Sequence, residues 1–403
     1  MIFLEAGINH LYLYGKRDGS GNRMMKFVNG AIGSAHFSAG DVASHDDFRV
    51  FGVEVQNAKA EGIKLKIDVA FRPTLCFQDL WVYDCYVHGS GVEGLYIGSS
   101  FYTYSATTLH YEHQMRRLRC FANESENNGQ DGLQVGCTDE DALVAYNWCR
   151  NNATAGISGQ NFAMVLNAGF TGHCHDNVLI REPLQIIPYS HTWVYNNTIY
   201  APTKDNAIFV RRSDNPMLGS PSYACFDPAA KLFIFNNLLV SNQDTVYILD
   251  ANDGASGTVP VAQITLINNI MRGPSPVEGA ELRYNEPGGG QTRLLDNYIA
   301  LATGDIGMNN AAADDFNLSG AGFSFLSANE GIDVSASVPV TDLPLGNYYD
   351  INGSRIPVRG FWRCGHTAKW IGYTEPDPSK TMLQWHQTAQ STVFTDKARI
   401  PEM

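Results

Sequence analysis

Acidic side chains stand directly before a small residue that opens a short apolar segment at several places along the chain. Two of them, Glu93 and Asp131, precede the similar segments 94–97 and 132–135. If these segments are equivalent strands of adjacent coils, their backbones lie about 5 Å apart. Two carboxylates at that distance bind a cation together or raise the pKa of one partner. The alternative is a structural role, because acidic residues beside a glycine turn commonly accept hydrogen bonds from backbone N–H groups.

Two loops beside these segments carry further candidates. The longer loop, residues 99–114, holds Tyr104, His110 and His113. A tyrosine gives a sugar ring an apolar stacking face, and an imidazole exchanges a proton near neutral pH. The same loop could instead be a lid that packs on its tyrosines and leaves its histidines at the surface. The shorter loop, residues 138–141, places Asp139 in an acidic cluster that could complete a calcium site or form a solvated turn.

Basic and polar residues on other segments extend the set. Arg211 and Arg212 follow the segment that begins at residue 207, three coils and hence about 14 Å from Asp131. An arginine there could hold a substrate carboxylate through paired hydrogen bonds, or form an ion pair with Asp205 or Asp214. The remaining candidates are possible bases and a row of outward side chains on successive segments. The bases are Lys64, Lys66 and His191, and the row is Tyr96, Gln134, Gln185, Phe209 and Tyr247.

The elements that must position these residues are short repeated strands. One four-residue pattern recurs: a small residue, an aliphatic residue, any residue and a second aliphatic residue. Its copies begin at residues 62, 94, 132, 156, 183, 207, 245 and 280, and the copies at 156 and 280 are weaker than the others. The shortest step, 24 residues, is about one bare coil of three short strands. The residues before these copies are Glu61, Glu93, Asp131, Ala155, Glu182, Asn206 and Asp244, with the copy at 280 left aside.

A second pattern lies between the first copies. Residues 193–199, 233–239 and 265–271 alternate with period two around an Asn-Asn pair, which is typical of a β-strand followed by a turn. An asparagine at such a turn tolerates the left-handed conformation, and its amide can bond the same side chain one coil away. The two patterns together predict an all-β fold, a right-handed single-stranded parallel β-helix solenoid.

Composition excludes several classes of protein. The formal net charge of −13 disfavours a nucleic-acid partner, and a charged content of 17% argues against disorder. No apolar run of about 18 residues is present, so we expect no membrane span. The first residues carry no signal peptide, and we expect that a natural N-terminal cap is missing. The eight cysteines form no Cys-x-x-Cys pair, and buried thiols explain their spacing at least as well as disulfides.

The double repeat, over roughly residues 8–300, resembles the pectate-lyase-like superfamily of right-handed β-helix proteins. Residues 350–355, followed by Gly360 and residues 371–373, resemble the closing segment of many secreted bacterial β-helix proteins. The resemblance implies a β-helix over residues 1–340, with a closing segment and irregular tail over 341–403 packed on it. It also implies a secreted, periplasmic or cell-surface protein whose polysaccharide substrate lies along one parallel sheet. The sequence motifs of polygalacturonases, alginate epimerases and pectate lyases are absent, so no family catalytic set transfers to this chain.

These residues and this resemblance suggest three functions. The leading hypothesis is a lyase that cleaves an acidic, uronate-containing polysaccharide by β-elimination. Ca²⁺ held by Glu93, Asp131 and Asp139, or an arginine, would neutralise the uronate carboxylate. Proton transfer would fall to His110, His113 or Arg211, since related lyases use an arginine or lysine as base. Substrate contacts would come from Tyr96, Tyr104, Gln134, Gln185, His191 and Arg212. The alternatives are a glycoside hydrolase that uses the Glu93 and Asp131 carboxylates, or a non-catalytic carbohydrate-binding or adhesion solenoid.

Overall fold

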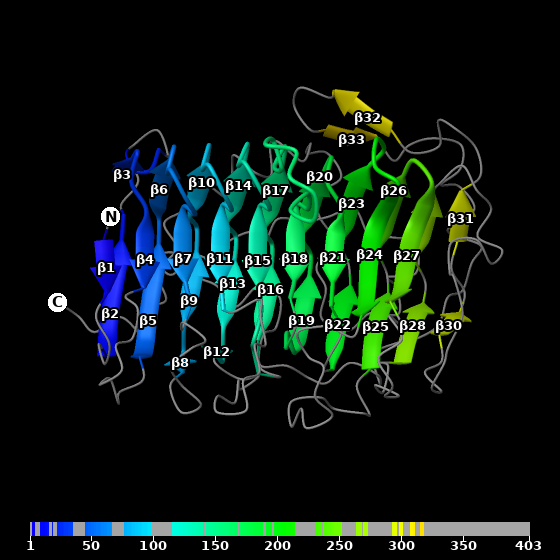
Figure 1. The fold of residues 1–403 in the computed structure, drawn as a ribbon, viewed down its shortest axis with the longest axis horizontal. Coiled ribbons are helices and arrows are strands. Elements are labelled where there is room, and N and C mark those ends of the chain that lie inside the picture. Colours follow the sequence, from blue (N-terminus) through cyan, green and yellow to red (C-terminus); the bar gives the residue numbers. More distant parts are fainter. Residues whose placement is uncertain are drawn as a thin grey trace.

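The chain forms a stack of coils, each built from three short strands that belong to three different parallel sheets (Figure 1). The computed structural model describes residues 2–4, 9–15, 18, 22–34, 45–66, 76–98, 115–139, 142–167, 169–187, 191–195, 197–213, 231–235, 237–251, 263–267, 269–272, 292–295, 298–300, 307–310 and 315–317. Within these ranges, no helix is long and apolar enough to cross a membrane.

The first sheet carries the first repeat. Its strands, in hydrogen-bonded order, are β1 (Ile2–Leu4), β4 (Ile32–Ser34), β7 (Ile63–Leu65), β11 (Leu95–Ile97), β15 (Leu133–Val135), β18 (Met164–Leu166), β21 (Leu184–Ile186), β24 (Asn206–Ser213) and β27 (Asp244–Ala251). Every neighbouring pair is parallel, as strands joined by one full coil must be.

The second and third sheets complete each coil. The second sheet contains β12 (Met115–Arg116), β8 (Phe77–Gln78), β5 (His45–Phe51), β9 (Trp81–Tyr83), β13 (Arg119–Phe121), β16 (Leu143–Ala145), β19 (Gly172–His175), β22 (Thr192–Tyr195), β25 (Lys231–Phe235), β28 (Gln263–Ile267) and β30 (Thr292–Leu295), and β2 (Asn9–Tyr14) pairs with β5. The third sheet contains β3 (Met25–Val28), β6 (Val53–Gln56), β10 (Tyr86–His88), β14 (Glu124–Glu126), β17 (Trp148–Arg150), β20 (Val178–Ile180), β23 (Thr198–Ala201), β26 (Leu238–Ser241), β29 (Ile270–Arg272) and β31 (Tyr298–Ala300). The predicted parallel β-helix is therefore confirmed.

A separate antiparallel hairpin follows the last described coil. It consists of β32 (Gly307–Asn310) and β33 (Asp315–Asn317), which pair with each other and with none of the three sheets. The predicted helix boundary at residue 340 and the closing segment 341–403 lie outside the described residues and stay predictions.

The core lies between the three sheets because alternate side chains of every strand point inward. In the first sheet the two end residues of β11 and β15 are fully buried in the core, and the middle residues, Tyr96 and Gln134, point outward in register. The register continues through Val165, Gln185, Phe209 and Tyr247. This confirms the predicted outward row, with Val165 as an additional member.

One coil departs from the predicted register. Residues 156–159 do not form a strand, and the chain reaches the first sheet only at β18. Gly156 and Gly159 adopt left-handed φ angles of 65° and 79°, and Ile157 between them is 43% exposed. The segment therefore turns outward instead of extending into the sheet. The residue that continues the row of Glu93 and Asp131 is Phe162 and not Ala155, because Gly132 N–H donates to the Phe162 carbonyl.

An asparagine ladder connects the turns between the second and third sheets. Its rungs are Asn123, Asn147, Asn177, Asn197, Asn237 and Asn269, and each Nδ2 donates to the next Oδ1 at 2.9–3.0 Å. The ladder was predicted from the Asn-Asn pairs, of which the second residue is the rung. The left-handed conformation falls on the residue before the rung, such as Tyr146 (φ 58°) and Asp176 (φ 52°), and not on the asparagine as predicted.

The six described cysteines are free and buried. Cys85, Cys120, Cys149 and Cys174 lie in the hydrophobic core, where burial raises the pKa of each thiol. The prediction of buried thiols is confirmed for these residues.

Candidate functional site

Two carboxylates, Glu93 and Asp131, meet on the outer side of the first sheet. They lie in the turns that precede β11 and β15, and Gly94 N–H donates to the Asp131 carbonyl at 3.0 Å, which joins the two coils. The Nε2 atom of Gln134, which points outward from β15, donates to Glu93 Oε1 at 3.1 Å and to Asp131 Oδ2 at 2.6 Å. Glu93 is 5% exposed and Asp131 only 1%. The structure thus brings together three of the predicted site residues, and we call Glu93 and Asp131 the carboxylate pair.

Two amides that the sequence analysis missed complete the surroundings of the pair. Gln160 contacts Gln134 Nε2 at 3.0 Å, and Asn167 Nδ2 donates to Gln134 Oε1 at 3.0 Å. The backbone N–H of Phe162 donates to Asp131 Oδ1 at 2.8 Å. Gln160 and Phe162 belong to the insertion before β18, and Asn167 follows β18 directly. Because residues 156–159 were wrongly predicted as a strand, neither amide was identified as part of the site. No repeat pattern marks either residue.

The insertion is fastened to the turn that carries Asp131. Backbone N–H groups of Ala153, Thr154 and Ala155 donate to carbonyl groups of residues 128–130 at 2.7–3.0 Å. The Thr154 hydroxyl also donates to the Asn128 carbonyl at 3.1 Å. These hydrogen bonds join the insertion that carries Gln160 to the turn that carries Asp131. The same turn therefore positions both residues.

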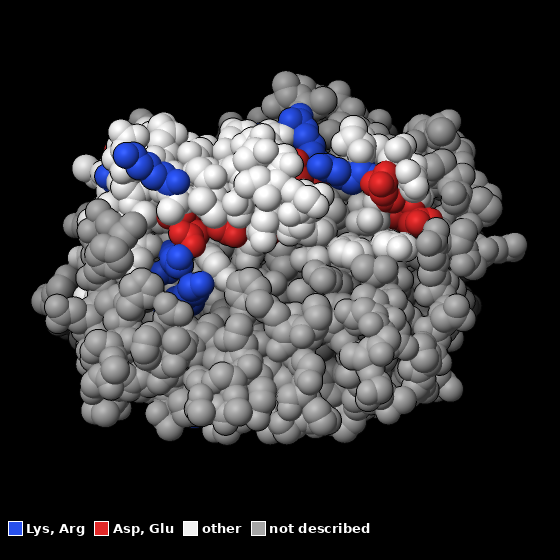
Figure 2. Space-filling model, viewed as in Figure 1, with Lys and Arg blue, Asp and Glu red and all other residues white. Residues whose placement is uncertain are grey.

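Basic side chains lie on the N-terminal side of the pair. Lys64 points outward from β7 and forms an ion pair with Glu61 at 2.5 Å. Lys66 places its Nζ atom 4.6 Å from the centre of the Tyr96 ring, a cation–π contact. Figure 2 shows acidic and basic side chains gathered over the region of β7 and β11 in Figure 1. The pair is therefore bordered by positive charge, in spite of the acidic net charge of the chain.

Burial raises the pKa of both members of the pair. For Asp131 the loss of hydration outweighs the hydrogen bonds from Phe162 and Gln134 and raises the pKa to about 7. Burial also raises the pKa of Glu93, while the two lysines oppose that shift. Burial would raise the pKa of Glu61 as well, but the hydrogen bond from Lys64, a backbone hydrogen bond and the charges of Lys64 and Lys66 together outweigh it and lower that pKa. A carboxyl group whose pKa lies near neutral pH, beside a second carboxylate, forms an arrangement that can donate and accept a proton.

Aromatic rings continue along the same face of the first sheet. Phe162 stacks on Phe209 with a centroid distance of 6.0 Å, and Phe209 stacks on Tyr247 at 5.7 Å. Gln185 lies between Val165 and Phe209 in the register of the sheet. The outward face thus runs from the lysines through the carboxylate pair to an aromatic row, in the order β7 to β27.

Other predicted residues lie away from the pair or outside the description. Asp139 accepts a hydrogen bond from Arg117 N–H at 2.9 Å, beside the second sheet, so it does not join Glu93 and Asp131. The ring of His191 lies 6.1 Å from that of Trp193 of β22 and is tilted by 33° to it, so His191 lies beside the second sheet and not on the predicted face. The backbones of Arg211 and Arg212 lie in β24, three strands from β15. Tyr104, His110 and His113 lie outside the described residues.

The described residues do not supply the ligand set that calcium requires. Ca²⁺ takes about 6–8 oxygen ligands, whereas both carboxylates of the pair accept hydrogen bonds from an amide nitrogen. Across the described ranges, no group of three or more His, Cys, Asp and Glu side chains could hold a metal ion. Calcium binding therefore stays a prediction.

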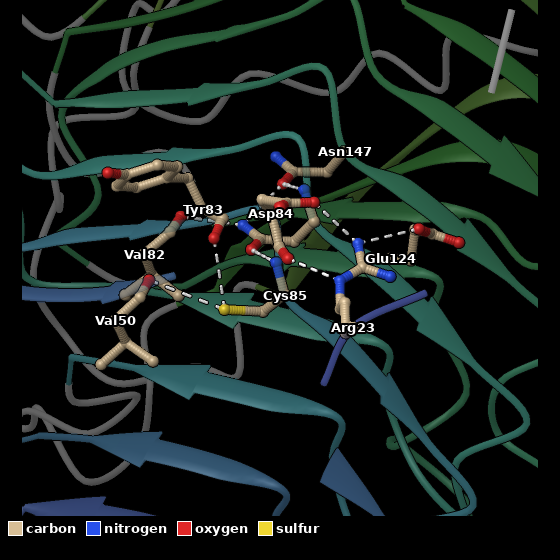
Figure 3. A network of polar contacts seen from close by, with 9 residues as sticks. Arg23, Val50, Val82, Tyr83, Asp84, Cys85, Glu124 and Asn147 are labelled. Atoms are coloured by element: carbon tan, nitrogen blue, oxygen red, sulfur yellow. Dashed lines mark hydrogen bonds and ion pairs between the residues drawn. The ribbon is translucent and has the colours of Figure 1, made fainter. Parts of the chain in front are cut away.

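A second buried charged cluster lies at the turns between the second and third sheets (Figure 3). Arg23 Nη2 contacts Asp84 Oδ1 at 2.9 Å and Glu124 Oε1 at 3.1 Å, and its Nε donates to the Asp84 carbonyl at 2.8 Å. Burial would lower the pKa of Arg23, but the two carboxylates outweigh it and raise that pKa. The three groups satisfy one another, so this cluster is structural.

Comparisons with known proteins do not identify the function of the site. No family model matches the chain, and no curated protein matches it. Among solved structures, a double mutant of the periplasmic alginate epimerase AlgG is similar, with 12% identity and a TM-score of 0.42 over 74% of this chain and 70% of that one. The class of the protein, a parallel β-helix, follows from its own strand pairing, and its chemistry must be argued from the residues of the pair.

Proposed function

We propose that this chain cleaves glycosidic bonds of a polysaccharide that lies along the outer face of the first sheet. The observation that carries the proposal is the convergence of two buried carboxyl groups, Glu93 and Asp131, on the single amide nitrogen of Gln134. Paired carboxyl groups in different protonation states are the machinery of most glycoside hydrolases. The acid–base pair makes hydrolysis, the alternative in the sequence analysis, the better supported reaction.

The roles of the two carboxyl groups follow from their surroundings. Asp131, with a pKa of about 7, is the proton donor to the leaving oxygen. Glu93 lies next to Lys64 and Lys66, which favour its ionised form, so it acts as the carboxylate that faces the developing positive charge. The two contacts to Gln134 hold the carboxyl oxygens closer than the ~6.5–9.5 Å of inverting enzymes. Retention of the anomeric configuration is therefore expected.

The lysines support an acidic substrate and a second reaction. Lys64 and Lys66 border the pair and could attract a uronate carboxylate to it. If they neutralise that carboxylate, the acidity of the neighbouring C–H rises, and β-elimination by a lyase becomes possible on the same face. The aromatic row of Phe162, Phe209 and Tyr247 would contact further sugars under either reaction. We therefore keep the secreted, periplasmic or surface location, which the sequence resemblance implies, as part of the proposal.

The test is a panel of neutral and uronate-containing polysaccharides, incubated with and without EDTA. New reducing ends without absorbance near 235 nm support hydrolysis, and absorbance at that wavelength supports elimination. Loss of either signal with EDTA would support the calcium prediction. Binding on affinity gels without cleavage of any polymer would reject both reactions and favour the adhesion solenoid.

A further inference from the structure

The amide of Gln134 has fewer hydrogens than the oxygens around it need. Its Nε2 atom carries two hydrogens and faces three oxygens: Glu93 Oε1 at 3.1 Å, Asp131 Oδ2 at 2.6 Å and Gln160 Oε1 at 3.0 Å. Gln134 is held in this orientation because Asn167 Nδ2 donates to its Oε1 at 3.0 Å. One of the three oxygens therefore needs a hydrogen from another source.

Rotating the Gln160 amide does not resolve the shortage. The same Gln160 atom lies 2.9 Å from Asp131 Oδ2 and 3.2 Å from Glu93 Oε1. As an oxygen, it meets two carboxylate oxygens with no hydrogen between them. As a nitrogen, it donates to both carboxylates but faces Gln134 Nε2 at 3.0 Å, where both atoms are donors. If both carboxylates are ionised, the first orientation leaves two unfavourable contacts and the second leaves one.

We propose that the resting carboxylate pair holds one proton on Asp131 Oδ2, donated to Gln160 Oε1, and that Gln160 is the positioning residue that keeps Asp131 in its donor form. With this proton the Gln160 oxygen receives a hydrogen, and only its 3.2 Å approach to Glu93 Oε1 is left without one. Asp131 supplies the hydrogen for Gln160, and the two hydrogens of Gln134 serve Glu93 Oε1 and Asp131 Oδ2. The kinetic consequence rests on the proposed function, but the position of the proton does not.

The groups around Asp131 favour a neutral carboxyl there. Asp131 is 1% exposed, and an ionised carboxylate is costly to bury without a cation. The ion pairs of the described residues include none to Asp131. Among the described residues, the charged groups that face the pair are Glu61, Lys64 and Lys66 of the preceding coil, and they act on Glu93. The single proton therefore belongs on Asp131 and the negative charge on Glu93.

The test replaces Gln160 by methionine, which fills the same space but cannot accept a hydrogen bond. Infrared difference spectroscopy follows the C=O band of the protonated carboxyl group during a pH titration, with Asp131→Asn to assign the band. We expect the midpoint for Asp131 to fall by about one pH unit in Gln160→Met, because its protonated form loses one hydrogen bond. In an active enzyme the alkaline limb of the pH–rate profile shifts to lower pH by the same amount.

Two further variants make the result decisive. Gln160→Glu adds a third carboxyl group and is expected to raise the midpoint, since like charges disfavour ionisation. Ser158→Ala, in the exposed part of the same insertion, should leave it unchanged. A midpoint that rises or stays constant in Gln160→Met would overturn the proposal, because it would mean that the amide nitrogen faces an ionised pair. The titration needs no substrate, so absence of polysaccharide cleavage would reject the proposed function alone.

Discussion

At the scale of residues, the chemistry of this chain depends on how far its polar groups are removed from water. Asp131 and Asp139 lie eight positions apart and were both predicted as cation ligands. Asp131 is buried against Glu93 and its pKa rises to about 7, whereas Asp139 accepts a hydrogen bond from Arg117 at another sheet. The same side-chain type thus has a raised pKa in one place and serves as a turn-forming acceptor in the other.

The residue that the proposed reaction needs most is Asp131. Asp131→Asn keeps the shape and the hydrogen bond from Phe162 but cannot donate an acidic proton. We expect the cleavage rate to fall by about 10²- to 10⁴-fold, the usual contribution of a general acid. The measurement is the initial rate of reducing-end release. Asp205→Asn, an exposed aspartate bonded to Gln243, is the matched control, and equal rates in both variants would remove Asp131 from the site.

At the scale of elements, the turns are held by ladders in which every rung serves two neighbours. Asn177 accepts from Asn147 through both N–H and Nδ2, and it donates to the Val144 carbonyl and to Asn197. These groups are buried, so the loss of one rung leaves several without partners. The ladder therefore links the turns of successive coils in register.

Replacing an inner rung should therefore be costly. Asn177→Ala is expected to lower the free energy of unfolding by about 2–4 kcal/mol, because it orphans buried donors and a carbonyl group. Denaturant unfolding followed by circular dichroism measures the change. Asn242→Ala, at an exposed turn, should change stability by less than about 0.5 kcal/mol. A similar small change for Asn177→Ala would show that the ladder is not what stabilises the turns.

A shorter ladder ends on a carboxyl group and predicts a pH dependence of stability. Asn128 Nδ2 donates to Asn152 Oδ1 at 2.8 Å, and Asn152 N–H donates to Glu182 Oε2 at 3.1 Å. Burial raises the pKa of Glu182 from its ordinary 4.5 to about 7. Between these two values the folded state keeps a proton that the unfolded state has lost, so stability falls as pH rises through this window.

Glu182→Gln removes the group that titrates and keeps an oxygen that accepts the hydrogen bond from Asn152. We expect the wild type to lose stability between pH 4.5 and 7, by roughly 3 kcal/mol at most from Glu182. The variant should lose less, with Asp131 supplying the remaining slope. Melting temperatures across this pH range provide the comparison. Parallel curves for the two proteins would mean that Glu182 is ionised in the folded state at pH 5.

At the scale of the whole molecule, long-range clusters tie coils together beyond the nearest-neighbour contacts of a solenoid. Arg23 in the first described coils reaches Asp84 and Glu124, which are 61 and 101 positions away. Such a buried cluster contributes little net stability when complete, but removal of one partner leaves uncompensated charges. The Arg23 cluster therefore links several coils of the N-terminal part of the stack to one another.

Arg23→Met leaves two buried carboxylates without their cation. We expect a loss of about 3–5 kcal/mol, with hydrogen exchange increasing in residues 45–66 more than in residues 192–213. Arg23→Met combined with Asp84→Asn and Glu124→Gln should recover much of that loss, since no charge remains buried. If the triple variant is as unstable as the single one, packing and not charge explains the effect of Arg23.

Much of the architecture could be predicted because its signals are local. The small–aliphatic repeat predicted the strands of the first sheet, the period-two pattern predicted those beside the Asn pairs, and alternation predicted Tyr96 and Gln134 as outward residues. One coil was misplaced because residues 156–159 imitate the repeat. Only their left-handed glycines and exposure, which depend on the surrounding contacts, show that they form a loop.

The site itself was predictable only in part. Glu93 and Asp131 were found because equivalent positions of adjacent coils must be neighbours. Gln160 and Asn167 were not found, since an insertion has no periodicity and its path depends on hydrogen bonds to residues 128–130. Side-chain pattern is a property of a few consecutive residues, and it was sufficient for the β-helix, its ladder and its outward face. Burial, and with it the raised pKa of Asp131, is a property of atoms brought together from several coils, so it was decided only when the chain folded.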